Sequence, residues 1–244
     1  MRLRLLGLLV LALSAPAAGQ WPPVVKNLQV FPKDTKFSTL IDTMKAFTRA
    51  LGVRCTYCHV GNESDALDKY DFASDDREPK AKARAMLRMV TAINDQYLPT
   101  LPSRRTPTIT VSCATCHRGV SQPIPIQRVV LGAYQSGGAD SAIAKYRALR
   151  TRYYGAAAYD FGEVPLSDVA DVLVADGKAA DGQKFNQLNA ELLPNSGFAF
   201  RQLGFGYLAL HDTANALTAW QKRLALQPNN PEAKDLVQSL TKKP

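Results

Sequence analysis

Apolar residues recur at helical spacing early in the chain and predict a helix over residues 40–51. The positions of this apolar stripe are Ile41, Met44, Phe47 and Leu51. A spacing of three to four residues places them on one side of a helix, which is the side that a helix normally buries. Ser38 or Thr39 is expected to cap the start of this helix, and Gly52 is expected to end it.

A second helix is predicted to begin after Asp75 or Asp76, because Pro79 then falls in the first turn, where proline is favoured. Its apolar positions continue to about Tyr97, and Pro99 follows as a stop signal. One helix is thus expected before each of the two cysteine pairs of the chain.

Beyond Ser136-Gly137-Gly138, which has the composition of a break, the pattern is helical and repeats. The dipeptide Pro194-Asn195 recurs as Pro228-Asn229 at the period of a tetratricopeptide repeat, and the spacing of the residues between them resembles that repeat. The matching positions are Phe200, Leu203, Gly204, Tyr207, Ala216, Trp220 and Pro228.

Two to three degenerate repeats are expected in this part. A weaker unit precedes at residues 169–194, and Ala142 and Tyr146 resemble the second helix of a still earlier one. We interpret Trp220 and Tyr207 as core between helices rather than as ligand contacts. Stacked helical repeats commonly offer a concave face to a protein, so a protein partner is expected there. The alternative is that these helices only cover the rest of the protein.

The start of the chain, residues 1–19, has the pattern of a secretory signal peptide. Arg2 and Arg4 form a basic start, residues 5–13 form a short apolar run, and small residues follow up to Gly19. The run is too short to cross a bilayer as a helix, and no later run is long enough. We therefore expect a periplasmic or otherwise exported protein that does not span the membrane after signal cleavage. An uncleaved anchor is the alternative.

The chain is mildly basic, with 30 Lys and Arg residues against 21 Asp and Glu residues and a net charge of +9. Nucleic-acid interfaces typically gather basic residues into a patch or stripe, and the sequence shows no run of Lys and Arg with interleaved aromatic residues. We therefore expect no nucleic-acid partner and interpret the charge as a solvated surface.

The four cysteines stand in two pairs, and each pair is followed at once by a histidine. The two motifs are Cys55-Thr56-Tyr57-Cys58-His59 and Cys113-Ala114-Thr115-Cys116-His117, in a chain with only 3 histidines. Cys-x-x-Cys-His is the attachment signature of c-type haem. A four-cysteine zinc site, a thioredoxin-like redox pair or two local disulfides would explain the cysteines, but none of them gives both histidines a role.

The spacing of the motif has a chemical reason. Two thiols separated by two residues can form thioethers with the two vinyl groups of one porphyrin, and the next histidine can supply the proximal nitrogen to the iron. The sequence therefore predicts two covalently bound haem c groups. The expected attachment residues are Cys55, Cys58, Cys113 and Cys116, and the expected axial histidines are His59 and His117.

Methionines upstream of each motif are candidates for the sixth iron ligand. Met44 lies on the predicted helix just before Cys55, so this helix and the turn that follows it can fold Met44 back over the opposite face of the first haem. For the second haem, Met89 is the first choice, and Met86, one helical turn earlier, is the substitute. All three methionines can instead be core residues. A vacant position also stays open, as does His211, the one spare histidine, which fits a surface turn better.

The chain around both motifs resembles the photosynthetic reaction-centre cytochrome c subunit family over roughly residues 25–125. The matching segments are Met44–His59, Leu87–Val90, Asn94, Tyr97-Leu98 and Cys113–Val120. The best-known members carry four haems and donate electrons to a photo-oxidised pigment pair, and this chain resembles their C-terminal, two-haem half.

This resemblance implies that Met44 is the axial methionine of the first haem. In the tetrahaem members the last haem takes its sixth ligand, a histidine, from the N-terminal half, which this chain lacks. The sixth ligand of the second haem and docking to a reaction centre therefore stay open.

The sequence predicts a mostly α protein, in which a small multihaem c-type cytochrome module precedes a tetratricopeptide-like helical-repeat module. The expected domains are a signal peptide (1–19), a dihaem cytochrome c domain (20–126), a linker (127–138) and helical repeats (139–244). We expect an electron carrier rather than an enzyme. Its redox partner would be a photosynthetic reaction centre or another periplasmic electron-transfer protein. Two other functions stay open: a dihaem peroxidase or gas-binding sensor with one open haem, and a scaffold acting through its repeats.

Overall fold

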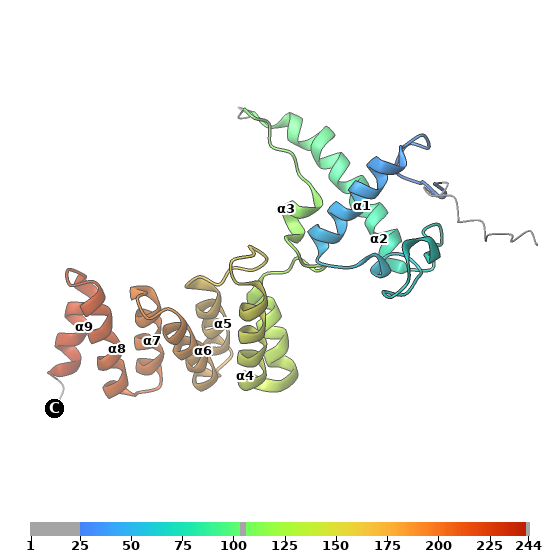
Figure 1. The fold of residues 1–244 in the computed structure, drawn as a ribbon. Helices are drawn as coiled ribbons and strands as arrows, with labels where there is room; N and C mark the ends of the chain where they lie inside the picture. The colour runs from blue at the N-terminus through green and yellow to red at the C-terminus, as the bar shows by residue number, and fades with distance from the viewer. Residues whose placement is uncertain (1–24, 103–105, 243–244) are drawn as a thin grey trace, which may run out of the picture. The chain divides into compact units, whose positions relative to one another are not determined.

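The computed structural model describes residues 25–102 and 106–242, and helices dominate it (Figure 1). Within those ranges the only β pairing is an isolated antiparallel bridge between Val60 and Asp71. The α-helices are α1 (Phe37–Leu51), α2 (Glu78–Ala92), α3 (Cys113–His117), α4 (Ile126–Tyr153), α5 (Val164–Ala175), α6 (Ala179–Leu192), α7 (Gly197–Ala209), α8 (Thr213–Leu226) and α9 (Pro231–Thr241). The predicted mostly α fold is confirmed.

The chain divides into two compact units. The first comprises the residues up to Arg49 together with Val53–Ser112, and the second comprises Ala50–Gly52 together with Cys113 onward. The last residues of α1 thus belong with the second unit, although the rest of that helix belongs with the first.

The signal peptide expected at residues 1–19 lies outside the described residues. Among the residues that the structure does describe, no helix has both the length and the apolar character needed to cross a bilayer.

Helix α1 forms where the apolar stripe predicted it, but it begins earlier, at Phe37. Ser38 and Thr39, the expected caps, lie inside its first turn. Phe37 adds an apolar side chain one turn before Ile41, which explains the earlier start. Gly52 follows the helix directly, as predicted, in a left-handed conformation (φ +65°) that glycine adopts without steric cost.

Helix α2 begins with Pro79 in its first turn, as predicted, and the chain stays helical beyond its end. A π-helical turn follows at Ile93–Tyr97, and a 3₁₀ turn follows at Leu98–Thr100. π-helical turns are rare and frequently mark functional sites. This one carries Asn94, whose contacts are described below.

Residues 25–102 and 106–125 contain almost no protein core. Ala50 and Val120 are the only buried residues described there, although two helices carry apolar stripes. Met86 and Met89 on α2 are 46% and 47% exposed. A folded segment of about 100 residues normally buries more than half of the surface that its unfolded chain exposes. Because residues 25–102 and 106–125 bury so little of their own apolar surface, their exposed apolar side chains suit contact with a further apolar group.

Helices α4–α9 form a row in which consecutive helices pack against one another (Figure 1). One core cluster joins α4, α5 and α6, and its largest fully buried side chains are Tyr146 and Phe185. A second cluster centres on Trp220 of α8, with Tyr207 of α7 packed against it. The paired helices confirm the predicted helical-repeat module. Trp220 is a core residue, as interpreted, whereas Tyr207 is partly buried: it packs against this cluster and also lines a groove.

The residues expected as a linker, 127–138, are helical in the structure. They form the first part of α4, which departs from helical geometry only at Gly137 and Gly138. Ile126 and Val130, ahead of this break, are buried in the same cluster as Ala142 behind it. The glycine pair marks a kink, but burial of the apolar residues before it stabilises helix rather than an open linker.

Polar side chains occupy core positions in the repeat that the sequence predicted only weakly, residues 169–194. Asn186 stands one repeat period before Trp220, and both Asn186 and Asn189 are buried. The Asn189 amide donates a hydrogen bond of 2.7 Å to the carbonyl oxygen of Glu163. A buried amide needs such a partner, so this unit adds a side-chain hydrogen bond to the apolar core that Phe185 and its neighbours form.

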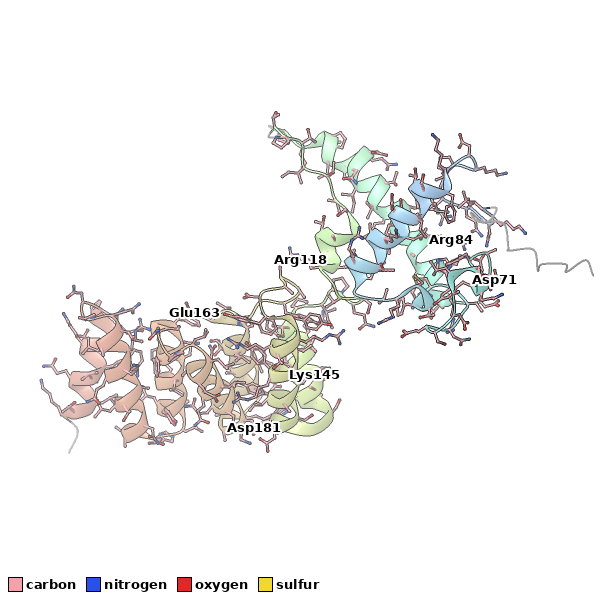
Figure 2. The ribbon with its side chains drawn as sticks, viewed as in Figure 1. Asp71, Arg84, Arg118, Lys145, Glu163 and Asp181 are labelled. Atoms are coloured by element: carbon pink, nitrogen blue, oxygen red, sulfur yellow. The ribbon has the colours of Figure 1, made fainter. Side chains whose placement is uncertain are left out.

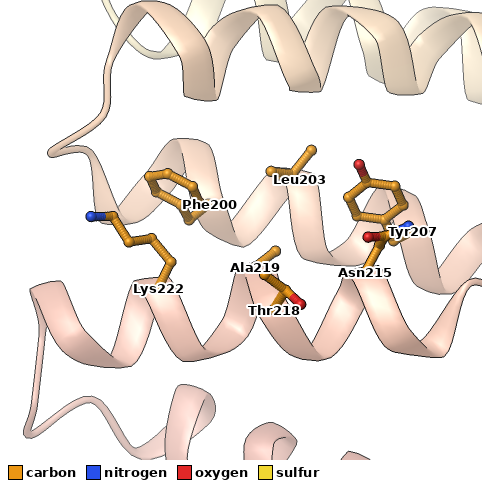
Figure 3. A pocket seen from close by; sticks show the side chains of 7 residues that line it. All are labelled: Phe200, Leu203, Tyr207, Asn215, Thr218, Ala219 and Lys222. Carbon is orange, nitrogen blue, oxygen red and sulfur yellow. The ribbon is translucent and has the colours of Figure 1, made fainter.

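A groove of about 300 Å³ lies between α7 and α8, and Figure 3 shows the side chains that line it. They are Phe200, Leu203, Tyr207, Asn215, Thr218, Ala219 and Lys222. The Lys222 ammonium lies 5.9 Å from the centre of the Phe200 ring. None of the predicted haem-binding residues lines this groove.

Candidate haem-attachment sites

The first motif folds into a single tight turn. Cys55–Tyr57 form a 3₁₀ turn, and the amides of Cys58 and His59 both donate to the carbonyl oxygen of Cys55, at 3.2 and 2.9 Å. Both cysteines are free thiols and partly buried. The turn therefore brings two thiols and an imidazole together within five consecutive residues.

The imidazole of His59 is held in its neutral form. Burial lowers its pKa, and the positive charge of Lys80 lowers it further, while the nearby Phe72 carbonyl acts in the opposite direction. The Phe72 ring meets the imidazole edge-on, with 5.0 Å between ring centres. Among the described residues, no partner reaches the buried Nδ1 atom with hydrogen-bond geometry. Neutral imidazole is the form that ligates metals.

Lys80 of α2 fixes the loop that carries Phe72. Its ammonium donates to the carbonyl oxygens of Phe72, Ala73 and Ser74, at 3.0, 3.0 and 2.6 Å, and it lies 3.0 Å from the Asp75 carboxylate. These contacts satisfy a side chain that is only 12% exposed. The side chain of Lys80 thus holds the backbone of the loop whose Phe72 ring packs against His59.

Asp75 and Asp71 tie the same loop to its surroundings. The Asp75 carboxylate accepts from Arg84 at 2.8 Å and from Asn27 at 3.0 Å. Asp71, which Figure 2 labels together with Arg84, accepts from the amides of Ala73 and Ser74, both at 2.9 Å. Two of the acidic residues in this region therefore have structural partners.

One thiol of each motif has a pKa raised above its ordinary value. Burial raises the pKa of Cys58, and the neighbouring Cys55 raises it further. Burial also raises the pKa of Cys113. A raised pKa disfavours the thiolate form, so neither Cys58 nor Cys113 is set up as a reactive thiolate.

The second motif, α3, is one short helix that contains Cys113, Cys116 and His117. The Nδ1 atom of His117 lies 2.9 Å from the Val120 carbonyl oxygen, and the Val120 amide donates back to the His117 carbonyl at 2.9 Å. A hydrogen bond from Nδ1–H to a carbonyl oxygen leaves Nε2 as the ring nitrogen with a free lone pair. That is the arrangement in which a histidine binds a metal through Nε2.

The segment leading into the second motif is held by Asn94 of the π-helical turn. The Asn94 amide donates to the Val111 carbonyl at 2.8 Å, and its oxygen accepts from the Val111 amide at 2.7 Å. Val111 stands two residues before Cys113. Only the family resemblance pointed to Asn94 in the sequence, and nothing there indicated its partner.

The structure brings together the residues of each motif, and the other predicted ligands lie on other elements. Met44 lies on α1 and is half-buried, and it belongs to the first unit, as do Cys55 and His59. Met89 belongs to the first unit and His117 to the second. His211 is exposed in the turn between α7 and α8, with a left-handed backbone (φ +58°), which agrees with its interpretation as a turn residue.

The residues present fit haem. Each motif offers two thiols and a histidine within one turn, His59 is neutral, and His117 has Nδ1 occupied. Exposed apolar side chains stand beside them in the chain, such as Tyr57 within the first motif. Among the described residues, no group of three or more His, Cys, Asp and Glu side chains could hold a metal ion by itself.

Two such turns in one chain define a c-type cytochrome. The family model of the photosynthetic reaction centre cytochrome C subunit matches residues 22–153. This match covers more than half of the chain, which therefore belongs to that family, and the predicted resemblance is confirmed. The match extends beyond the second motif to Tyr153, the last residue of α4.

Similar curated proteins point the same way. The chain is 43% identical over 98 residues to cytochrome c-554 of Chloroflexus aurantiacus, covering 40% of this chain and 21% of that protein. It is 34% identical over 119 residues to the photosynthetic reaction center cytochrome c subunit of Thermochromatium tepidum, covering 46% of this chain and 25% of that protein. The chain thus matches a quarter or less of the length of these relatives.

Solved structures resemble the helical part. The Sgt2 TPR domain from Aspergillus fumigatus is 17% identical, with coverage of 48% of this chain and 74% of that domain and a TM-score of 0.32. PcrH from Pseudomonas aeruginosa is 16% identical, with coverage of 48% and 89% and the same TM-score.

Proposed function

We propose that this chain is a periplasmic dihaem c-type cytochrome that passes single electrons between proteins. The observation that carries the proposal is the pair of Cys-x-x-Cys-His turns with free thiols, in a chain that belongs to a cytochrome family. When bound, each haem would supply an iron that alternates between the ferric and ferrous states. No side chain has to act as an acid or a base, so we expect an electron carrier rather than an enzyme.

The side chains of each turn would divide the work of holding and orienting haem. The proposed thioether residues are Cys55, Cys58, Cys113 and Cys116, and the proposed axial histidines are His59 and His117. Burial and Lys80 keep His59 neutral, and the Val120 carbonyl orients the ring of His117. Contacts around an axial histidine fix its orientation and tune the ligand.

Methionines are the proposed sixth ligands. Met44 stands on the helix that leads into the first motif and belongs to the same unit as His59. Methionine opposite histidine raises the reduction potential of a haem. For the second haem we propose Met89, on the helix that leads toward Cys113.

The proposed partners follow from the family and the fold. A photosynthetic reaction centre or another periplasmic redox protein would exchange electrons with the haems. The helices α5–α9 would offer a surface to a protein, as stacked repeats commonly do. Export would use residues 1–19 as a signal peptide.

The test is the intact mass of the secreted protein, made in a host with a c-type maturation system. We expect the mass of the chain from about residue 20, plus two haems that survive acid–acetone extraction. The double variant Cys55→Ala/Cys58→Ala should lose one haem, and so should Cys113→Ala/Cys116→Ala. Thr56→Ala/Tyr57→Ala changes only the residues between the thiols and should keep both. Free thiols or bound zinc in the wild type would contradict the proposal.

A further inference from the structure

The groove between α7 and α8 repeats a face that another helix covers elsewhere in the second unit. The residues that line it have equivalents one repeat period earlier, on α5 and α6. Most of these equivalents are apolar, are at most 3% exposed and lie in the core cluster shared with α4, namely Leu166, Val169, Leu173, Phe185 and Leu188. The α5–α6 face is therefore closed by the helix that packs against it.

Polar side chains at the edge of the α5–α6 face also pair with α4. The hydroxyl of Tyr134 on α4 donates to the Asp181 carboxylate at 2.7 Å. The carboxylate of Asp140 on α4 lies 3.6 Å from the Lys184 ammonium. A helix thus closes this face by covering its apolar floor and by placing a negative charge beside the lysine at its edge.

The α7–α8 pair presents the equivalent positions without such a cover. Phe200, Leu203 and Tyr207 of α7 are only half-buried, and the groove of about 300 Å³ lies open beside them (Figure 3). Helix α6, which packs on α7, contributes an amide here, because Gln187 donates to the Tyr207 hydroxyl at 3.1 Å. A hydrogen bond to that hydroxyl leaves the apolar floor of the groove uncovered.

Two differences between the repeats explain the hollow and give it a charge. Ala219 stands where the preceding repeat has Phe185, so the floor lacks a ring, and Lys222 stands where that repeat has Leu188. Lys222 is exposed, and its ammonium lies 5.9 Å from the centre of the Phe200 ring. Among the described residues that line the groove, Lys222 is the only charged one. The groove therefore combines an apolar floor with one positive charge at its rim.

We propose that this groove binds an amphipathic helix of a protein partner, which places an apolar side chain on the floor and a carboxylate beside Lys222. This role rests on the protein surface proposed for α5–α9 and specifies the chemistry of the partner. The contact has a precedent within the unit, where α4 covers the α5–α6 face and brings Asp140 to Lys184. An apolar anchor in a pocket supplies most of the affinity of such a contact, and a charge pair at the rim supplies selectivity.

The test is a selection from a library of short helical peptides, with the haem-loaded full chain as the target, followed by affinity measurements by fluorescence anisotropy. Ala219→Phe returns to the groove the ring that the preceding repeat carries. Lys222→Glu reverses the charge at the rim and changes only an exposed side chain. Lys145→Glu is the matched control, because it makes the same charge change at an exposed lysine of α4, outside the groove (Figure 2).

We expect the selected peptides to share an apolar residue with Asp or Glu one helical turn away. Ala219→Phe should weaken their binding about tenfold or more, because the apolar anchor loses its place. Lys222→Glu should weaken it about 3- to 10-fold, and it should favour versions of the peptides with Lys in place of the acidic residue. Lys145→Glu should leave the affinity nearly unchanged.

Three results would overturn the inference: no enriched peptide, enriched peptides without an acidic residue, or affinities that both groove variants leave unchanged. If circular dichroism shows that Ala219→Phe does not fold, Lys222→Glu decides alone. Intact mass reports the haem content of the same samples. A wild type without two haems would contradict the proposed electron transfer and would leave the result for the groove standing.

Discussion

The side-chain amide of Asn94 pairs with both backbone groups of Val111, donating to its carbonyl at 2.8 Å and accepting from its amide at 2.7 Å. This is the pattern by which one strand pairs with another, made here by one side chain with a residue well separated from it in sequence. It fixes the chain two residues ahead of Cys113.

Asn94→Ala is expected to lower the free energy of unfolding by about 1–3 kcal/mol, because two partly buried hydrogen bonds of about 0.5–1.5 kcal/mol each are lost. Asn94→Asp keeps only the acceptor, so its free energy of unfolding should lie between those of the wild type and Asn94→Ala. Denaturant titration of the haem-loaded protein measures the loss. Gln96→Ala, an exposed neighbour in the same turn, should stay within about 0.5 kcal/mol of the wild type. Equal stability of Asn94→Ala and Gln96→Ala would refute the role of this pair.

Met44→Ala is expected to lower the reduction potential of one haem and leave the other nearly unchanged. The methionine sulfur favours ferrous iron, and Met44 stands on α1, the helix that leads into Cys55. A redox titration followed in the visible spectrum measures both potentials. Lys45→Ala, next to it and exposed, is the control. If the potential and spectrum do not move, Met44 is a packing residue only.

Met89→Leu is expected to make one haem high-spin and able to bind carbon monoxide in the ferrous state, because leucine keeps the bulk of methionine without its sulfur. Met86→Leu, one turn earlier on α2, should leave the spectrum unchanged. Carbon monoxide binding by the wild type would mean that Met89 is not a ligand, and it would favour the peroxidase or gas-sensor alternative. If only His211→Ala changes the spectrum, the sixth ligand is His211, in the turn between α7 and α8.

Asp75→Asn is expected to destabilise the protein at neutral pH and to matter less as the pH falls. Hydrogen bonds from Arg84 first, then from Asn27 and Lys80, hold the pKa of Asp75 well below its usual range. A carboxylate with a depressed pKa stabilises the fold above its unfolded pKa of about 3.9, and this contribution is lost as the pH falls from there through the folded pKa. Unfolding midpoints of both proteins from pH 7 downward should converge below about pH 4. A constant difference at every pH would show that the charge is not involved.

Trp220→Ala is expected to lower the free energy of unfolding of the helical repeats by about 3–5 kcal/mol. The side chain is fully buried, and Phe205 meets its ring edge-on with 4.9 Å between centres. Far-UV circular dichroism during thermal unfolding measures the effect. Val172→Ala removes an exposed side chain of the same module and should change little. A small loss in Trp220→Ala would mean that the cluster repacks around the cavity.

Residue type and spacing were enough to predict helix ends and the cysteine motifs, because these features depend on a few neighbouring residues. A glycine such as Gly52 commonly ends a helix, and a proline such as Pro79 commonly lies in the first turn of one. Two cysteines separated by two residues and followed by a histidine indicate haem attachment. The helix over residues 126–136 was not expected, because Gly137 and Gly138 suggested a break, while its stability comes from burial against residues much later in the chain.

Backbone contacts escaped prediction for a different reason. Every residue carries a carbonyl and nearly every one an amide N–H, so nothing in the sequence singles out Val120 as the partner of His117. Only the fold decides which of these groups meet. Asn186 was hard to recognise as a repeat core position because its polar side chain stands where the next repeat has Trp220.

The scarcity of buried side chains among residues 25–102 and 106–125 has a consequence for how the protein is made. The repeats bury their own core through contacts between neighbouring helices, and such modules gain structure from near-neighbour contacts alone. The segment with the cysteines lacks that source of stability. We therefore expect the nascent chain to mature in sequence: the repeats fold unaided, while both cysteine pairs stay open to the enzymes that attach haem. Until haem is attached, a protease should cleave the segment with the cysteines faster than it cleaves the repeats.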